Sequence, residues 1–334
     1  MGYITLKERL SRLSNLRKGL NAISYAFIIG AMLLVPAHLN AQDIKINETN
    51  FPDPIFRAIV DSLAGNTHVL TQQTINSTTS FNSVNIKGSF LSKRGIKSLK
   101  GIEYFTELTS LYCQDNPITS IDLSNNKKLT VLNLTGSKVT SLDLSNNTDL
   151  VTINCAQLKT LESINVKKCS KLIKLYLADN KLAELDVTQN PSLKELSCNN
   201  NQLTRLDLSK NTALTKLWVG KNSNLTSLDL SNNTNLTYLS IDNNNMLELK
   251  VSMLPKLQTL YCLNNKLTSL DLSKNTALTF LSCYSNQLTS LDLTNNTSLK
   301  ELYCYKNNIS SLALPSAATS KIAIVNASNN AWLH

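Results

Sequence analysis

The side chains that most often carry out catalysis are scarce in this chain. Of its 334 residues three are histidines, and beyond residue 41 only His68 and His334 remain. No Ser–His–Asp or Cys–His arrangement is visible, and no glycine-rich phosphate loop occurs. The sequence therefore predicts a protein that is not an enzyme, with no catalytic residues and no cofactor.

Seven cysteines are the remaining candidates for chemistry, as disulfides or metal ligands. Metal ligands must converge on one point, whereas six of these cysteines recur at one inward position of an internal repeat and would form a line. A free cysteine behaves as a small buried hydrophobe, so we expect reduced, buried thiols and no metal site. The six are Cys113, Cys155, Cys198, Cys262, Cys283 and Cys304. Cys169 replaces an asparagine at a turn and is a candidate lone thiol.

A repeat of 21 residues is the strongest pattern in the sequence. Leu257–Ala277 reads LQTLYCLNNKLTSLDLSKNTA, and Leu278–Ser298 reads LTFLSCYSNQLTSLDLTNNTS. The consensus is LxxLxCxxNxLxxLxLxxNxx. Ten full units and a partial eleventh cover residues 108–334. The units begin at Leu108, Leu129, Leu150, Leu172, Leu193, Leu214, Leu236, Leu257, Leu278, Leu299 and, for the partial unit, Ile322.

Stacking explains why the leucines recur. One coil cannot bury its own apolar edge, but stacked coils share a continuous core. The stretch LxxLxCxxN predicts a short strand with alternating inward and outward side chains, and LxxLDLSxN predicts a second extended segment on the opposite wall. Asparagines at positions nine and nineteen are expected to bond to backbone groups of their own and adjacent coils. The fold class is therefore a solenoid of short parallel strands, mostly β and loop with little helix.

This unit resembles the leucine-rich repeat, L-x-x-L-x-L-x-x-N/C-x-L. Its sixth-position cysteines make it similar to the 21-residue, cysteine-ladder repeats of internalin J and related secreted bacterial proteins. The resemblance covers residues 108–334. It implies an exported bacterial protein that binds a partner through its repeats.

Residues 42–107 precede the regular units and are expected to form an N-terminal cap with one degenerate coil. Ile44–Ile46 is strand-like, and Asn50–Leu63 predicts a short helix with proline at its start. The apolar residues expected to cover the first coil are Phe51, Ile55, Phe56, Ile59 and Leu63. The degenerate coil is expected over 83–108, with Ile96, Leu99 and Ile102 near repeat positions.

The phrase NFPDPIFRAIV resembles the N-terminal cap of exported bacterial leucine-rich-repeat proteins. Such caps often continue with an Asp-rich stretch similar to a calcium loop. Here that place, Ala64–Ile75, holds no acidic residue. The resemblance therefore implies the cap and not the calcium.

Residues 1–41 predict a secretory signal peptide. A basic stretch ends near Lys18, the apolar run Tyr25–Val35 follows, and Ala41 is a small residue suited to cleavage. The apolar run is shorter than the roughly 20 residues that a membrane span needs, and no later segment is apolar enough to span. We therefore expect a secreted or cell-surface protein with no membrane span in the mature chain.

Nucleic acid is not an expected partner, although the formal net charge is +10. Five of the basic residues lie in the predicted signal peptide, and the rest are spread along the chain. Nucleic-acid binding usually needs a clustered basic face. The densest remaining group has a solvated loop as its simpler interpretation: Lys87, Lys93, Arg94, Lys97 and Lys100.

Aromatic residues gather at the outward positions of the first strand. Seven of the eight tyrosines beyond residue 41 are there, and only Tyr104 is not. Exposed aromatic clusters mark binding surfaces, and the alternative is cross-strand packing that stabilises the sheet. The predicted ligand-binding residues are Trp218, Tyr238, Tyr261, Phe280, Tyr284, Tyr303 and Tyr305, with Tyr112 and Tyr176 on the same face.

The other wall carries a row of aspartates, which either accept bonds from nearby Ser and Thr hydroxyls or hold cations. They are Asp122, Asp143, Asp186, Asp207, Asp229, Asp271 and Asp292. We prefer the structural interpretation, because the same residues recur in nearly every unit.

Three functions fit the sequence. The first is a monomeric module for protein–protein interaction in adhesion or host interaction, with a protein ligand on a host or bacterial surface. The second is glycan binding, because Tyr and Trp rings stack on sugars. The third is a structural component of the envelope, which would have no soluble ligand. Fold alone does not choose among them.

Overall fold

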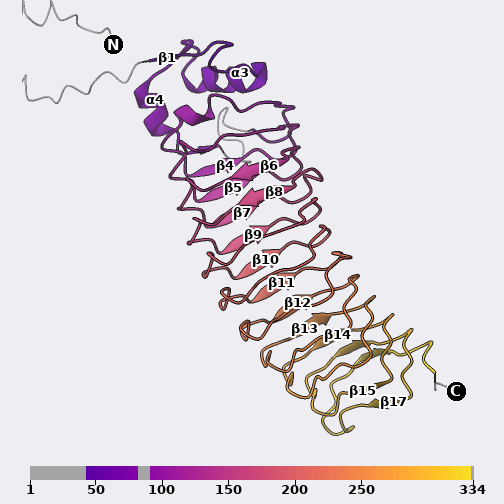
Figure 1. Cartoon of the computed structure of the whole chain (residues 1–334). Coiled ribbons are helices and arrows are strands. Elements are labelled where there is room, and N and C mark those ends of the chain that lie inside the picture. Colours follow the sequence, from indigo (N-terminus) through magenta and orange to yellow (C-terminus); the bar gives the residue numbers. More distant parts are fainter. Residues whose placement is uncertain (1–42, 82–90, 332–334) are drawn as a thin grey trace, which may run out of the picture. The chain divides into compact units, whose positions relative to one another are not determined.

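The first half of each repeat forms a short strand, and these strands stack in parallel (Figure 1). In the computed structural model, which describes residues 43–81 and 91–331, they build a 12-stranded sheet. Its strands are β3 Ser80–Phe81, β4 Ser110–Tyr112, β5 Val131–Asn133, β7 Thr152–Asn154, β9 Lys174–Tyr176, β10 Glu195–Ser197, β11 Lys216–Trp218, β12 Tyr238–Ser240, β13 Thr259–Tyr261, β14 Phe280–Ser282, β16 Glu301–Tyr303 and β18 Ile324–Asn326. The solenoid predicted from the repeat is confirmed, and we call this sheet the first wall.

The second half of each repeat forms the second wall, and it is less regular than expected. Two pairs of strands lie there: β6 Ser141–Asp143 with β8 Ser163–Asn165, and β15 Ser290–Asp292 with β17 Ser311–Ala313. In the other described coils this segment keeps alternate buried and exposed residues but is not paired as a strand. The expectation of extended segments on both walls holds. Regular strands of the second wall form only where the backbones of neighbouring coils are hydrogen-bonded. An example is the bond that Leu293 N donates to Ala313 O at 2.8 Å.

The core is one continuous cluster that runs through the stack. In the coil that begins at Leu257, the side chains of Leu257, Leu260 and Leu267 are fully buried, and Cys262 lies among them. On the second wall Leu272 is also buried. Because every coil offers the same inward positions, each leucine packs on its equivalents in the coils before and after it.

Asparagine side chains connect the coils at both turns. At the ninth position, Asn201 Nδ2 donates to Leu177 O of the preceding coil at 2.9 Å and to Cys198 O of its own coil at 3.0 Å. At the nineteenth position, Asn211 Nδ2 donates to Val187 O and Asn190 O, both at 2.9 Å. These bonds satisfy carbonyl groups that the turns would otherwise bury without a partner, as the sequence predicted.

The N-terminal cap combines two helices and a small sheet. Strand β1 Ile44–Lys45 pairs antiparallel with β2 Val69–Leu70, α3 spans Pro54–Leu63, and α4 spans Gln72–Ser77. Asp53 caps α3, because its Oδ1 accepts Ile55 N and Phe56 N at 3.0 Å, while its Oδ2 accepts Lys97 N at 2.7 Å. One carboxylate therefore begins the helix and ties it to the first coil.

Aromatic rings join the cap to the stack. Phe51, Phe56, Phe81 and Phe105 are fully buried, and Phe81 meets Phe105 edge-on with ring centroids 5.1 Å apart. The prediction that Ile55 covers the first coil is wrong, because its side chain is 37% exposed. Ile55 lies on the same side of α3 as Ile59 but near its exposed end, so that only Phe56, Ile59 and Val60 of the helix are buried.

The degenerate coil before Leu108 has a different start from the one predicted. Its strand is β3, which precedes residue 83 and pairs with β4, while residues 82–90 lie outside the described ranges. The 3-10 helix η1 at Ile102–Tyr104 follows. Ile96, Leu99 and Ile102 are buried, as expected.

The inward and outward assignment can be tested at two adjacent residues of β13. Leu260 is fully buried, whereas Thr259 faces outward and is half-buried. Replacing Leu260 by Ala leaves a cavity in the shared core and should lower the free energy of unfolding by about 2–5 kcal/mol. Thr259→Ala should cost less than about 1 kcal/mol. Denaturant titration measures both, and equal losses at the two positions would contradict the assignment.

Candidate interaction surface

Five aromatic residues form a row on the outward face of the first wall. Successive coils place them alternately at positions five and three, so each ring packs diagonally on the next. The ring centroids are 4.7–5.9 Å apart, with interplanar angles of 37–42°. We call this set the aromatic row: Trp218, Tyr238, Tyr261, Phe280 and Tyr303.

The strand register explains why the row alternates. Ser240 lies directly between Trp218 and Tyr261, and Ser282 lies directly between Tyr261 and Tyr303. Although both serines face outward, they are only 7% and 3% exposed. A small residue opposite each large ring lets the rings lean across the sheet and cover it.

The aromatic row therefore packs across strands and also remains at the surface. Each of its rings is half-buried, which means that one side rests on the sheet and on neighbouring rings. The packing interpretation of these residues is confirmed as a structural fact. The exposed parts of five adjacent rings still form one aromatic strip.

A second, shorter row lies beside the first at position seven. Tyr284 and Tyr305 stack with ring centroids 4.3 Å apart and an interplanar angle of 11°. In the three preceding coils the same position holds Gly220, Asp242 and Leu263. All seven predicted binding residues therefore belong to one surface that extends over five coils.

The earlier coils of the same wall are polar. The hydroxyl of Tyr176 donates to Glu195, and Lys174 and Lys216 lie 3.6 and 3.7 Å from the same carboxylate. Burial together with this bond raises the pKa of Tyr176 to about 12, and the bond lowers the pKa of Glu195. Tyr176 thus belongs to a charged cluster that ends where the aromatic row begins.

The cysteines line the core behind this wall. All seven are free and buried. Burial raises the pKa of the Cys155, Cys198 and Cys262 thiols from an ordinary value of 9.0 to about 12. The thiolate is the form that attacks or binds metal, so these thiols are suited to packing and to neither chemistry. Within the part of the chain that the structure describes, no group of three or more His, Cys, Asp or Glu could hold a metal ion.

Comparison with known proteins agrees with this geometry. The functional domain of InlJ from Listeria monocytogenes, which includes a cysteine ladder, is similar over 86% of this chain and 72% of its own, with 28% identity and a TM-score of 0.64. An internalin from the same species, InlF, is similar over 87% of this chain and 99% of its own, with 25% identity and a TM-score of 0.60.

This chain is an internalin-like leucine-rich-repeat solenoid. A leucine-rich-repeat protein of Leptospira interrogans shares the fold, with 22% identity over 69% of each chain and a TM-score of 0.56. No family model and no curated relative matches the sequence.

One cysteine of the internalin-like solenoid departs from the ladder, as the sequence predicted. Cys169 takes the place of the nineteenth-position asparagine in a coil that is one residue longer, and its Sγ lies 3.6 Å from both Leu144 O and Asn147 O. Asn147 donates to the equivalent carbonyls, Leu123 O and Asn126 O, one coil earlier. The thiol therefore replaces the asparagine at a buried turn, where a weak S–H donor faces two carbonyl groups.

The aspartates of the second wall cap turns. Asp271 Oδ1 accepts the backbone N–H of Ser273 at 3.0 Å, and Asp186 accepts both the hydroxyl and the backbone N–H of Thr188. These bonds lower the pKa of both carboxyl groups. A local turn thus accounts for the recurrence of aspartate, as the structural interpretation predicted.

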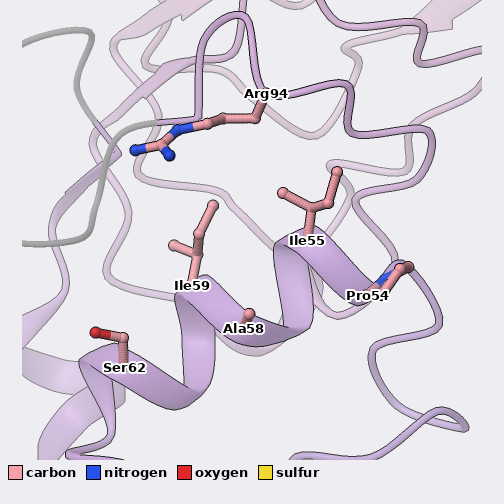
Figure 2. A pocket seen from close by; sticks show the side chains of 6 residues that line it. All are labelled: Pro54, Ile55, Ala58, Ile59, Ser62 and Arg94. Atoms are coloured by element: carbon pink, nitrogen blue, oxygen red, sulfur yellow. The ribbon is translucent and has the colours of Figure 1, made fainter.

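Two hollows lie away from the aromatic row. On the second wall, Lys167, Asp186, Arg205 and Glu184 border one, and they form two ion pairs. On the cap, Ile55 and Ile59 rise from α3 on the side that faces Arg94 (Figure 2).

No helix of the described ranges is long and apolar enough to cross a membrane. The predicted signal peptide lies outside those ranges.

The state of the thiols can be measured directly. We expect the six ladder cysteines of the internalin-like solenoid to resist an alkylating reagent in the folded protein and to react after unfolding, because they are buried and protonated. Mass spectrometry of peptides counts the labelled sites. Labelling of the ladder before unfolding, or a disulfide between two of its members, would contradict the structure.

The raised thiol pKa values also predict a loss of stability in alkali. Above pH 9 the unfolded chain releases the Cys262 proton, while the folded chain keeps it up to a pKa of about 12. The unfolded state then binds fewer protons, so the free energy of unfolding falls as pH rises. Relative to Cys262→Val, we expect the parent chain to lose about 1.4 kcal/mol for each pH unit between the unfolded and the folded pKa of this thiol.

The control is built into the repeat, because Val219 occupies the same ladder position in another coil. Denaturant titrations of both proteins below and above pH 9 give the difference. A difference that does not change with pH would show that Cys262 is not buried as a protonated thiol.

Proposed function

We propose that this solenoid is a secreted or cell-surface module that binds a protein ligand through the aromatic row and the adjoining Tyr284–Tyr305 pair, in adhesion or host interaction. The observation that carries the proposal is the continuity of that surface. Seven aromatic residues from five consecutive coils gather on one wall, while the second wall carries aspartates that cap turns.

The anatomy of protein interfaces supports this proposal. Interface centres are enriched in Trp, Tyr and Phe, and a few such residues carry most of the binding energy. Half-buried rings are already ordered by their neighbours, so a partner loses little of its binding energy to fixing them. The likeness to internalins supports a protein-interaction module as the general class.

Ring geometry favours a protein over a glycan. A sugar stacks on an open ring face, whereas Tyr284 and Tyr305 already cover one face of each other, and the rings of the row lean on one another at 37–42°. What remains exposed is a strip of half-buried rings that already lean on one another. Such a strip fits an irregular protein surface better than a flat sugar.

Replacing Tyr284 and Tyr303 together by Ala tests the surface. The two side chains come from β14's coil and β16's coil and face outward, so the variant should fold. It loses the two ring contacts with Tyr305 and Phe280, which are worth about 0.5–1.5 kcal/mol each. Binding to a partner found among surface-protein ectodomains should weaken at least tenfold, as measured by surface plasmon resonance.

The matched control lies on the opposite wall. Asp271→Ala with Asp292→Ala alters two exposed residues of the coils that begin at Leu257 and Leu278 and should leave the affinity nearly unchanged. Thermal unfolding of both variants checks the fold. If the aspartate pair abolished binding while the tyrosine pair had no effect, the aromatic surface would be the wrong face, and a glycan array with the same variants would reveal a sugar ligand.

A further inference from the structure

Asp242 is the one acidic residue at position seven within the aromatic surface. It follows Tyr238 and Ser240 on the outward side of β12's coil, and it is half-buried. Its Oδ1 accepts the hydroxyl of Ser240, the serine that lies between Trp218 and Tyr261. The carboxylate is therefore held beside the first three rings of the aromatic row.

Gly220 leaves the space that this carboxylate occupies. A methyl group at Gly220 would lie 2.5 Å from Asp242 Oδ1 and 2.8 Å from Asp242 O, closer than carbon atoms approach oxygen. The backbone of Gly220 does not have a positive φ, so the chain conformation does not demand a glycine there. The glycine is needed because the Asp242 side chain approaches it closely. Gly220 is two residues beyond Trp218, so Asp242 lies directly over the preceding coil at that point.

The Asp242 carboxylate has no cationic partner among the described residues. Glu195, on the same wall, is neutralised by Lys174 and Lys216. Asp242 instead accepts two neutral donors, Ser240 Oγ and Asn243 Nδ2, the second at 2.7 Å. Lys221 bonds to Asp242 only through its backbone N–H, and its exposed side chain forms no ion pair with the carboxylate.

Two unused lone-pair positions and the neighbouring rings define what would bind. A carboxylate has about four acceptor positions, and two are filled. Burial raises the pKa values of Tyr238 and Tyr284, and the negative charge of Asp242 adds to that rise in both. Negative charge beside aromatic rings attracts a cation, and a planar guanidinium both pairs with a carboxylate and stacks on rings.

We propose that Asp242, with Trp218 and Tyr238 beside it, receives an arginine side chain of the protein partner. This inference rests on the proposed function, since it assigns one contact within the same surface. The arginine would donate two hydrogen bonds to the free positions of the carboxylate while its flat face lies against the rings. Lysine fits less well, because its ammonium group is a point charge that cannot stack in this way.

A random dodecapeptide library displayed on phage provides the probe. Peptides are selected on the wild-type chain, synthesised with a fluorophore, and measured by fluorescence anisotropy. We expect the selected peptides to contain arginine, and Asp242→Asn to weaken their binding at least tenfold. Replacing that arginine by citrulline, which has the same shape without the charge, should weaken binding to the wild type equally and should change binding to Asp242→Asn little.

Asparagine is chosen because it keeps the shape of Asp242 and can still accept the Ser240 hydrogen bond. Asp271→Asn removes the same charge from the second wall and should bind every peptide as the wild type does. If Asp242→Asn also binds them unchanged, or if citrulline costs nothing, the inference is wrong. Loss of binding in the Tyr284→Ala, Tyr303→Ala variant would then still support the proposed function, whereas unchanged binding in that variant would refute the function itself.

Discussion

Hydrogen bonding at the turns is the constraint on which this solenoid depends. A coil of about 21 residues must bend sharply, and its bends bury carbonyl groups where no strand can pair them. Asn201 and Asn211 show the solution, because the Asn201 amide reaches one carbonyl of its own turn and one of the coil before, and the Asn211 amide reaches two carbonyls of the coil before. An unpartnered buried carbonyl costs about 1–3 kcal/mol. The asparagines therefore set the spacing at which the leucines of successive coils meet.

Once that spacing is set, outward side chains are brought into rows as well. A parallel sheet without shifts places position five of one coil opposite position five of the next. In the aromatic row, rings at position five alternate with rings at position three and pack diagonally, whereas Tyr284 and Tyr305, both at position seven, stack directly on each other. Serines at 240 and 282 fill the remaining places and are covered in turn. The rings of the aromatic row are thus held in place by one another and by the sheet. A binding surface built in this way is ordered before any partner binds.

The same regularity keeps reactive groups out of use. Thiols at the sixth position are buried among leucines, where burial holds them protonated. Carboxylates on the second wall are used as turn caps. Along the first wall, Glu195 is neutralised by lysines while Asp242 is not. A charge that the fold leaves without a cation, placed among rings that the fold has already ordered, is the feature of this surface that most resembles a recognition element.

Much of this architecture could be predicted from the sequence because the same pattern of residues recurs in ten full units. The period, the inward leucines and the asparagine positions each follow from spacing, and one drifted coil does not obscure ten others. Features that occur only once in the chain were harder to predict. The periodicity of α3 suggested that Ile55 covers the first coil, but a helix of ten residues can rotate, and only the packing of Phe56 on Phe81 decided which residues are buried. The extended segments of the second wall were correctly expected, yet whether they pair depends on distances between coils.

Sequence alone also determined that the aromatic residues share one wall, since positions three, five and seven all point outward. Only the tertiary structure decided how they lie there. Diagonal packing of Trp218, Tyr238 and Tyr261 requires the register of three strands, and residues in it are about 20 positions apart in the chain. The position of Asp242 over Gly220 was also decided only by the tertiary structure. The sequence does not show whether a glycine is needed for space or for a turn. Local periodicity fixes which side a residue faces, whereas contacts between coils fix what it touches.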